Sequence, residues 1–468
     1  MTHQASSSTI TTSSQTTVRG RARTAGPKVR LGRVVAGSLA AGLVTGVLLV
    51  FASVIPAGEA AATGALLIGF AFGWVLMAVL SVRFTDQPLR WAFAPAAFMG
   101  FGGLTLIAFG SSSQPVVSWV WPPALLTITV WTVMQSRRQP LSTGVRALLY
   151  PVFAFLALAS IGGGIETVLE VVDTARYPIA GQVVDVDGHG MHLNCAGTGS
   201  PTVVLEPGGG ELSSNLGWIT PAVARDTRVC VYDRPGRGWS DPTDAPQDGT
   251  RVAADLHTLL HAAHVPGPYV LAGHSFGGLY VLTYAAHYPG EVAGMVLIDS
   301  TSPTTPGPQT EAAPAASDGP VARGSALVSV AARFGLGRLY SLTSYGGLPT
   351  RSRDEVRATI STAATLRSTI DEYVQASTSM QEAAELQNFG AKPLVVLTAG
   401  DGSDPSWFAK QDKLAHLSTN TVHRVVAGAS HEMLVGDRMA SVSTITAIRD
   451  VVSAIRSGSP LANWAVVP

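Results

Sequence analysis

Ser275 lies in the segment Gly273-His274-Ser275-Phe276-Gly277, in which two glycines flank a serine at the spacing of a sharp strand-to-helix turn. The apolar residues 269–272 predict a strand before it, and residues 276–288 predict a helix after it. A tight turn of this kind requires small residues beside the serine, whose hydroxyl then projects from the strand end. The segment therefore predicts a nucleophile; a glycine-rich turn with an incidental serine is the structural alternative.

A serine hydroxyl needs a base to take its proton before it can attack a carbonyl. The chain has 11 histidines, and His431 is the strongest candidate because it follows the last predicted strand and precedes a helical tail. Most other histidines are explained by the polar sides of helices, and His274 occupies the variable position of the serine turn. We therefore predict His431 as the general base.

The base in turn needs a carboxylate that orients it and stabilises its charged form. Asp401 and Asp404 follow the predicted strand 393–398, whereas Asp299 ends the preceding predicted strand, 295–299. All three lie between the serine and the histidine in chain order. The sequence favours Asp404, then Asp401, then Asp299, for which an ordinary turn at a strand end is the structural alternative.

The negative charge that develops on a substrate oxygen needs two converging backbone N–H groups. The N–H of Phe276, directly after the serine, is expected to supply one of them. Three consecutive glycines, 208–210, follow the predicted strand 202–205 and allow the backbone to curl inward. We predict Gly209 as the second donor, with Gly208 as the alternative.

The elements that must position these residues begin at about residue 173, where short strands alternate with helical patterns such as 247–264. Several strands are apolar throughout, which is typical of a sheet buried on both faces. The alternation predicts an α/β domain with a mostly parallel sheet over residues 173–468. The predicted strands span residues 181–187, 191–196, 202–205, 228–232, 269–272, 295–299, 393–398 and 423–426.

Residues 301–391 interrupt this alternation. They begin with a stretch rich in Pro, Thr and Ala and continue with helical patterns over 326–342 and 354–376. An insertion of this length between two strands is well placed to act as a cap or lid.

The region from residue 34 to residue 172 contains apolar runs, each close to the ~20 residues that cross a bilayer core. None of these runs contains Asp, Glu, Lys or Arg. A buried helical bundle is the alternative, but a series of charge-free runs favours a five-helix transmembrane domain. The runs span residues 34–55, 61–82, 91–110, 116–134 and 147–165.

The loops between these runs predict the orientation. Arg83 and Arg90 lie in the second loop, and Arg137, Arg138 and Arg146 lie in the fourth, whereas the first and third loops contain no Lys or Arg. Since basic residues gather on the cytoplasmic side, we expect a cytoplasmic N-terminus. An odd number of spans then places the C-terminal domain outside the cytoplasm, in a multi-pass protein of the plasma membrane.

The formal net charge of zero, from 31 basic and 31 acidic residues, is divided unevenly. Residues 1–33 carry +6 and are otherwise rich in Ser, Thr and Gln, which predicts a disordered cytoplasmic tail, with a DNA-binding arm as the alternative. Residues 34–172 carry +1, and residues 173–468 carry −7. Only 13% of the chain is charged, against about 25% in soluble domains, so we expect neither an ordinary soluble protein nor a nucleic-acid binder.

Taken together, these segments resemble the α/β-hydrolase superfamily of serine esterases, lipases and peptidases. The similar segments are 203–210, 231–241, the serine turn, 397–400 and the His431 loop, in the order of that family and within residues 180–457. The resemblance implies an eight-stranded, mostly parallel sheet, a Ser-His-Asp triad and a cap after the sixth strand. This chain departs from the family in having Pro207-Gly208 where many members have His-Gly.

The chain has two cysteines, too few for a disulfide-rich scaffold or a four-ligand zinc site. In the sheet order that the resemblance implies, Cys195 and Cys230 fall in neighbouring strands. A disulfide between them is expected if the domain lies outside the cytoplasm; two buried thiols are the alternative. The excess of Arg over Lys, with the abundant Ala and Gly, suggests a bacterial source.

These patterns predict a membrane-anchored serine hydrolase that cleaves an ester through an acyl-enzyme, without a metal or an organic cofactor. Apolar cap residues such as Leu336 and Leu339 extend the expected substrates to a lipid ester, although they could equally form the core of the cap itself. The rival predictions are a peptidase, a thioesterase or a haloperoxidase-like enzyme on the same triad. A non-catalytic binding domain is disfavoured, because the residues of a triad are present.

Overall fold

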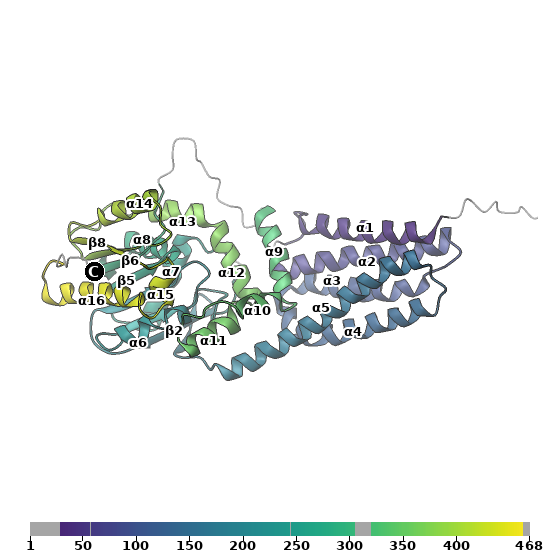
Figure 1. Ribbon diagram of the computed structural model, residues 1–468, viewed down its shortest axis with the longest axis horizontal. Helices are drawn as coiled ribbons and strands as arrows, with labels where there is room; N and C mark the ends of the chain where they lie inside the picture. Colours follow the sequence, from purple (N-terminus) through teal and green to yellow (C-terminus); the bar gives the residue numbers. More distant parts are fainter. Residues whose placement is uncertain (1–28, 57, 244, 305–319, 462–468) are drawn as a thin grey trace, which may run out of the picture.

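The computed structural model of the chain describes residues 29–56, 58–243, 245–304 and 320–461. An α/β domain lies at one end and a bundle of long helices at the other, with further helices between them (Figure 1). Most of the predicted basic tail, residues 1–28, lies outside the described residues, as does most of the Pro/Thr-rich stretch. The first helix begins at residue 31, so the last residues of the predicted tail are helical.

The α/β domain is built on one eight-stranded sheet in the order β1-β2-β4-β3-β5-β6-β7-β8. β1 pairs with β2 and β2 pairs with β4 antiparallel, whereas all other neighbours are parallel. This confirms the predicted fold class, and each predicted strand corresponds to an observed one. The strands are β1 Gln182–Val186, β2 His189–Ala196, β3 Thr202–Glu206, β4 Val229–Tyr232, β5 Tyr269–His274, β6 Val292–Ile298, β7 Leu394–Ala399 and β8 Thr421–Val426.

Helices cover both faces of this sheet. On one face, apolar side chains of α7, α8 and α14 pack against the strands, and on the other face those of α6, α15 and α16 do so. The central strands β3, β5 and β7 are buried along their whole length, because they have helices above and below. The covering helices are α6 Ile219–Val223, α7 Gly249–Ala262, α8 Phe276–His287, α14 Pro405–Ala415, α15 Met433–Gly436 and α16 Ser441–Ser457.

Five N-terminal helices are long and apolar enough to cross a membrane, as the sequence predicts. The fourth is continuous through Pro122 and Pro123, and the fifth runs to Arg176, beyond the predicted domain end at residue 172. The helices are α1 Leu31–Val50, α2 Glu59–Phe84, α3 Phe93–Phe109 (preceded by the 3-10 turn Arg90–Ala92), α4 Gln114–Arg137 and α5 Thr143–Arg176.

The first two of these helices approach closely through glycines. A Cβ atom added to Gly42 would lie 2.9 Å from the Cα of Gly73, and one added to Gly69 would lie 2.3 Å from the backbone of Gly46. Close backbone packing of this kind stabilises helix pairs in a membrane, where apolar burial drives association only weakly.

Between β6 and β7 lies a cap of helices, whose bounds differ from the prediction. The predicted helix 326–342 is two helices, separated at Gly335, whose φ of +77° ends the first. The predicted helix 354–376 is likewise divided at Thr362, whose side chain caps the helix that follows. The helices are α9 Pro320–Ala332, α10 Leu336–Ser341, α11 Thr350–Thr359, α12 Ala363–Val374 and α13 Ala376–Ala383.

Cys195 of β2 and Cys230 of β4 are joined by a disulfide. The two residues face each other directly in the antiparallel pairing of these strands. The bond crosslinks the antiparallel part of the sheet to β4, which also pairs with the parallel strand β3.

Candidate active site

Ser275 sits at the tip of β5, where the chain turns into α8. Its backbone has φ +52° and ψ −119°, a conformation that non-glycine residues rarely adopt. The neighbouring glycines permit this turn: a Cβ atom on Gly273 would lie 2.4 Å from the carbonyl oxygen of Gly277, and one on Gly277 would lie 2.5 Å from that of Glu206. The local sequence therefore forces the serine hydroxyl out of the sheet end, as predicted.

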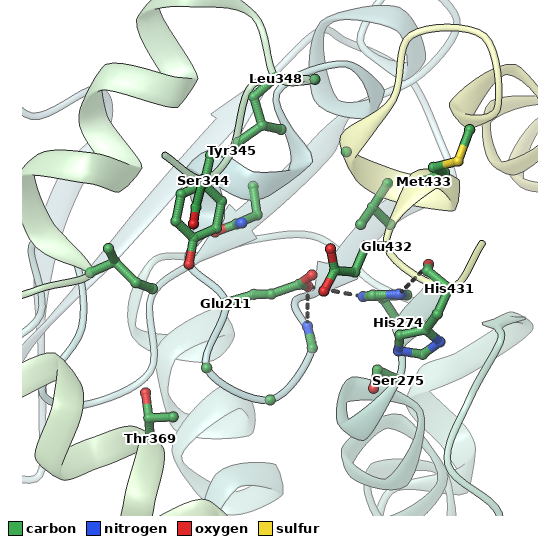
Figure 2. A pocket seen from close by; sticks show the side chains of 18 of the residues that line it. Glu211, His274, Ser275, Ser344, Tyr345, Leu348, Thr369, His431, Glu432 and Met433 are labelled. Atoms are coloured by element: carbon green, nitrogen blue, oxygen red, sulfur yellow. Dashed lines mark hydrogen bonds and ion pairs between the residues drawn. The ribbon is translucent and has the colours of Figure 1, made fainter. Parts of the chain in front are cut away.

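His431 lies in the loop after β8, and Asp299 follows β6. The Nδ1 atom of His431 is 2.6 Å from Oδ2 of Asp299, a hydrogen bond that leaves Nε2 free to face the serine. Figure 2 shows the imidazole directly beside Ser275. Among the hydrogen bonds of the described residues none yet joins Ser275 to His431, and such bonds commonly shorten only when substrate binds.

The structure corrects the predicted choice of acid. Asp404 caps the N-terminus of α14, where its carboxylate accepts the backbone N–H groups of Ser406 (2.8 Å) and Trp407 (2.9 Å). Asp401 is exposed and bonds the backbone of Ala429 through its own N–H. The ranking was wrong because both aspartates belong to the turn that starts α14, whereas Asp299, ranked last, is the one that reaches His431.

Trp407, which the sequence did not single out, holds the acid from the other side. Its indole N–H donates to Oδ1 of Asp299 at 2.7 Å, and the backbone N–H of Ala399 donates to the same oxygen. Burial alone would raise the pKa of Asp299, but the hydrogen bonds from His431 and Trp407 outweigh it and hold that pKa below its usual value. Asp299 is therefore an ionised partner for the histidine at neutral pH.

The glycine loop after β3 lies beside the serine turn. The N–H of Gly208 donates to Glu211 (2.6 Å) and that of Gly210 to Glu372 (3.1 Å). In the described part of the chain, the N–H of Gly209 has no such acceptor, and a Cβ atom placed on Gly209 would lie 3.3 Å from the Phe276 ring. This geometry favours Gly209 over Gly208 as the partner of the Phe276 N–H in an oxyanion hole.

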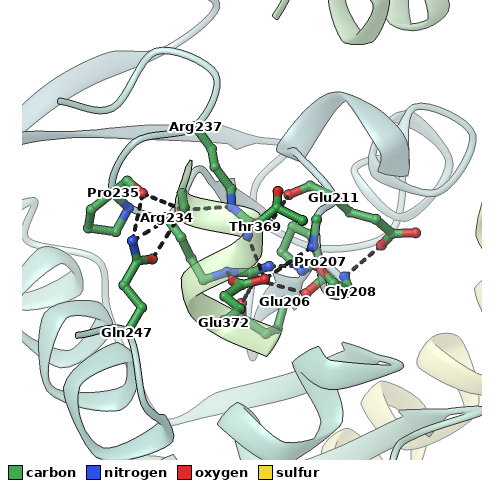
Figure 3. A network of polar contacts seen from close by, with 12 residues as sticks. Glu206, Pro207, Gly208, Glu211, Arg234, Pro235, Arg237, Gln247, Thr369 and Glu372 are labelled. Atoms are coloured by element: carbon green, nitrogen blue, oxygen red, sulfur yellow. Dashed lines mark hydrogen bonds and ion pairs between the residues drawn. The ribbon is translucent and has the colours of Figure 1, made fainter. Parts of the chain in front are cut away.

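Two buried arginines fix this loop (Figure 3). Arg234 donates to the carbonyl oxygens of Pro207 (2.8 Å) and Gly208 (2.6 Å) and forms ion pairs with Glu206 and with Glu372 of α12. Arg237 forms a second ion pair with Glu372, at 2.5 Å. Because Glu372 comes from the cap, one buried network ties the cap, the arginines and the oxyanion loop together.

His274, for which the sequence suggested no special role, is a buried partner of a carboxylate in the site. Its Nδ1 atom is 3.0 Å from Oε2 of Glu211, and its Nε2 atom is 3.2 Å from the carbonyl oxygen of His431 (Figure 2). Burial alone would lower the pKa of His274, but the Glu211 carboxylate outweighs this effect and raises it. The histidine next to the serine therefore anchors the loop that carries His431.

Ser275 and His431 open into a cavity of about 820 Å³ between the sheet and the cap. The sheet side supplies the glycine loop and the His431 loop, and the cap supplies residues from Gly337 on α10 to Tyr373 on α12. Three carboxylate residues line it, Glu211, Glu432 and Asp437, and no Lys or Arg does so among the described residues.

One group elsewhere has metal-ligand chemistry. His257 and His261 of α7 lie with Glu291 so that their ligand atoms are within 4.8 Å of one another. Glu291 precedes β6, at the end of the sheet opposite Ser275, and it also accepts a hydrogen bond from Tyr284. The residues already bond one another, so the group is explained as a polar cluster that joins α7 to α8.

A family model described as the alpha/beta hydrolase fold matches residues 201–436, half of the chain. The chain belongs to the α/β-hydrolase family. The matched region contains the serine turn, Asp299, the cap and His431, so the hydrolase activity class follows from the family. The helical bundle lies outside the matched residues.

Similarity to individual proteins is more limited. An uncharacterized protein of Schizosaccharomyces pombe is 45% identical over 87 residues, which cover 19% of this chain and 16% of that protein. An uncharacterized vacuolar membrane protein of Saccharomyces cerevisiae is 36% identical over 106 residues, 21% of this chain and 16% of that protein. The chain thus spans less than one fifth of the length of these two relatives.

Among solved structures, an N-formylmaleamic acid deformylase from Pseudomonas putida is similar, with a TM-score of 0.44 and 19% identity. The similarity covers 57% of this chain and 99% of that one. With the five apolar helices, the family assignment describes a membrane protein that carries an α/β-hydrolase domain.

Proposed function

We propose that the protein is a serine hydrolase that cleaves a carboxylic ester, with Ser275 as nucleophile, His431 as general base and Asp299 as acid. The observation that carries this proposal is the 2.6 Å hydrogen bond between Asp299 and His431, whose imidazole lines the same cavity as the strained serine. A neutral imidazole held through Nδ1 presents an unprotonated Nε2 to the serine, which is what proton abstraction requires.

The reaction follows from these positions. The Ser275 oxygen attacks the ester carbon as His431 takes its proton, and the N–H groups of Gly209 and Phe276 stabilise the oxyanion. His431 then returns the proton to the departing alkoxide, the C–O bond breaks and an acyl-serine remains. Water then attacks the acyl group as the same histidine takes its proton. The bond between the acyl carbon and the serine oxygen breaks, the histidine returns the proton to that oxygen, and the acid is released.

The proposed location of this chemistry is outside the cytoplasm. It is supported by the arginines of the second and fourth inter-helix regions, which lie at the end of the bundle opposite the α/β domain, and by the positive-inside rule. The Cys195–Cys230 disulfide agrees, because such bonds persist in oxidising compartments. The plasma membrane is the expected membrane.

A fluorophosphonate probe tests both the proposed nucleophile and the proposed location. The serine oxygen displaces fluoride from the probe and becomes phosphonylated, so purified wild type should be labelled and Ser275→Ala should not. Ser430→Ala is the matched control, because this serine lines the same cavity but has no place in the proposed triad, and it should be labelled like wild type. Equal labelling of wild type and Ser275→Ala would contradict the proposed nucleophile.

The same probe in a membrane-impermeant form, applied to intact cells, tests the location. Labelling of intact cells agrees with an extracytoplasmic site, whereas labelling only after lysis contradicts the proposed orientation.

A further inference from the structure

The cap rests on the ends of the membrane helices. Arg323 of α9 donates to the carbonyl oxygens of Ala52 (2.9 Å) and Ile55 (2.6 Å), which follow α1. Arg333, just after α9, forms an ion pair with Glu59 at the start of α2. These bonds satisfy carbonyls and a carboxylate at the boundary of an apolar bundle, where unpaired polar groups are costly.

The next cap helix is attached in the same way. Arg338 of α10 binds both carboxylate oxygens of Glu166 (2.9 and 3.0 Å) and also Asp173 (2.7 Å), two residues on one face of α5. Close packing fixes the position of this contact along α5, because a Cβ atom on Gly162 would lie 2.5 Å from the carbonyl oxygen of Phe334. The turn between α9 and α10 thus lies against residues 162–166 of α5.

The position of this contact along α5 coincides with the expected edge of a bilayer. Glu166 lies twenty residues beyond Arg146 on one continuous helix, a rise of about 30 Å, which equals the thickness of the hydrocarbon core. Arg146 belongs to the basic end of the bundle. The start of α10 is therefore placed where the hydrocarbon core ends and the headgroup region begins.

The outward face of α10 is apolar. The exposed fractions are 57% for Leu336 and 65% for Leu339, and 60% for Leu342, which directly follows the helix. At the same level, α5 exposes Ile165 and Val168, which continue the apolar surface of the membrane-spanning helices. Three exposed leucines on one short segment beside this surface are explained by contact with lipid, in the manner of a helix that lies in the interface.

The inner side of the same helix faces the active site. Gly337, next to Leu336, lines the cavity that holds Ser275, together with Leu348 and Ile360 of the following cap segments. The helix α10 lies between the α/β domain and the membrane helices (Figure 1), and its Gly337 lines the cavity, so one short helix separates the expected bilayer surface from that cavity. The cavity is lined by three acidic residues and by no described Lys or Arg, so its lining favours a neutral ligand over a phosphate.

We propose that the substrate is a neutral lipid ester, of the acylglycerol type, which passes from the adjoining bilayer leaflet across α10 to Ser275. This inference rests on the proposed serine hydrolase activity. The leucines of α10 admit the acyl chain, the cavity holds its ester end, and the carboxylates disfavour anionic phospholipids.

The test uses the full chain in vesicles of ether-linked phosphatidylcholine, which contains no ester to compete. Dioleoylglycerol or dioleoylphosphatidylglycerol is added as the lipid ester, and 4-nitrophenyl acetate serves as the soluble ester. Dioleoylglycerol should release oleate at least about tenfold faster than the anionic lipid, since a factor of ten needs only about 1.4 kcal/mol of discrimination.

The variant Leu336→Ser/Leu339→Ser should lower oleate release about tenfold or more, because each leucine loses apolar burial in the interface. Its hydrolysis of 4-nitrophenyl acetate should equal that of wild type. Met439→Ser/Val442→Ser is the matched control, since these residues are exposed by 77% and 52% on the α/β domain near α16; it should alter neither rate.

The failures are distinguishable. If wild type hydrolyses the soluble ester but releases no oleate, the lipid substrate is overturned and the serine hydrolase activity still stands. If wild type shows neither activity and no fluorophosphonate labelling, the proposed function itself is overturned. Equal loss of both activities in the leucine variant overturns the path across α10. Equal rates on the two lipids overturn the selection for a neutral ester.

Discussion

His431 and Trp407 bind opposite oxygens of one carboxylate, that of Asp299, at 2.6 Å and 2.7 Å. The imidazole comes from the loop after β8 and the indole from α14, so two separate segments position the same acid. Asp404 contributes indirectly, because it caps the helix that carries Trp407. The aspartate favoured by sequence thus supports the proposed triad without touching it.

The replacement Asp299→Asn should lower kcat/KM for an ester by about 10³–10⁴-fold, because the amide cannot hold the productive imidazole tautomer or stabilise its charge. Steady-state hydrolysis of 4-nitrophenyl acetate measures this. Asp404→Asn is the matched control: asparagine caps a helix as well as aspartate does, so activity should stay near wild type. A large loss in Asp404→Asn with an active Asp299→Asn variant would contradict the geometry.

The helix cap at Asp404 can be predicted from neighbouring residues, whereas the contact between Asp299 and His431 joins distant parts of the sequence. Asp404-Pro405 carries a readable signal for a helix start, since aspartate is a preferred N-cap and proline a preferred first residue. That signal could have removed Asp404 from consideration. No local pattern, however, shows that Asp299 faces His431, because the whole cap and two strands intervene in the chain.

Other features were accessible from sequence for physical reasons. The serine turn is a local structure, in which glycines are required on either side because a Cβ atom at either position would lie 2.4–2.5 Å from a backbone oxygen. The membrane helices follow from composition alone. The His274–Glu211 and Arg234–Glu372 pairs could not be predicted, because their partners are 63 and 138 residues apart and belong to different elements.

The buried Glu372 should be important for stability. Glu372→Gln leaves Arg234 and Arg237 with a neutral partner in a site from which water is excluded, a change that costs about 3–5 kcal/mol when a buried pair is broken. Thermal unfolding in detergent should therefore show a melting temperature lower by roughly 6–20 °C. Glu385→Gln, which alters an exposed pair with His287, should leave the melting temperature unchanged; equal shifts would contradict a cap held by the buried network.

The disulfide gives a further prediction. Denatured but unreduced protein should show no free thiol, and reduction should release two per chain, as measured by thiol titration. Cys195→Ser/Cys230→Ser should destabilise the domain by about 2–4 kcal/mol, since the crosslink restricts the unfolded chain. Two blocked cysteines in protein isolated from its native membrane under thiol-blocking conditions would contradict both the bond and the proposed compartment.

The His274–Glu211 pair should make stability depend on pH in a defined direction. The pKa of His274 is raised in the folded protein, so its contribution is fully present below the unfolded value of about 6.5 and is lost as pH rises through the folded pKa. Burial alone would raise the pKa of Glu211, but His274 outweighs this effect and lowers it. The stabilising contribution of Glu211 is therefore present above the pKa that Glu211 has in the unfolded chain. It is lost as pH falls through the lower pKa that Glu211 has in the folded protein.

The difference in melting temperature between wild type and Glu211→Gln should consequently be greatest near pH 5–6.5, between the two unfolded pKa values of about 4.3 and 6.5, and should narrow towards both extremes. Thermal unfolding across a pH series measures it. Glu432→Gln, a change in the same cavity that preserves the pair, controls for loss of a negative charge. A difference that is constant with pH, or that grows on the alkaline side, would show that the two side chains do not form a charged pair, because it is the opposite pKa shifts caused by their pairing that link stability to pH in this way.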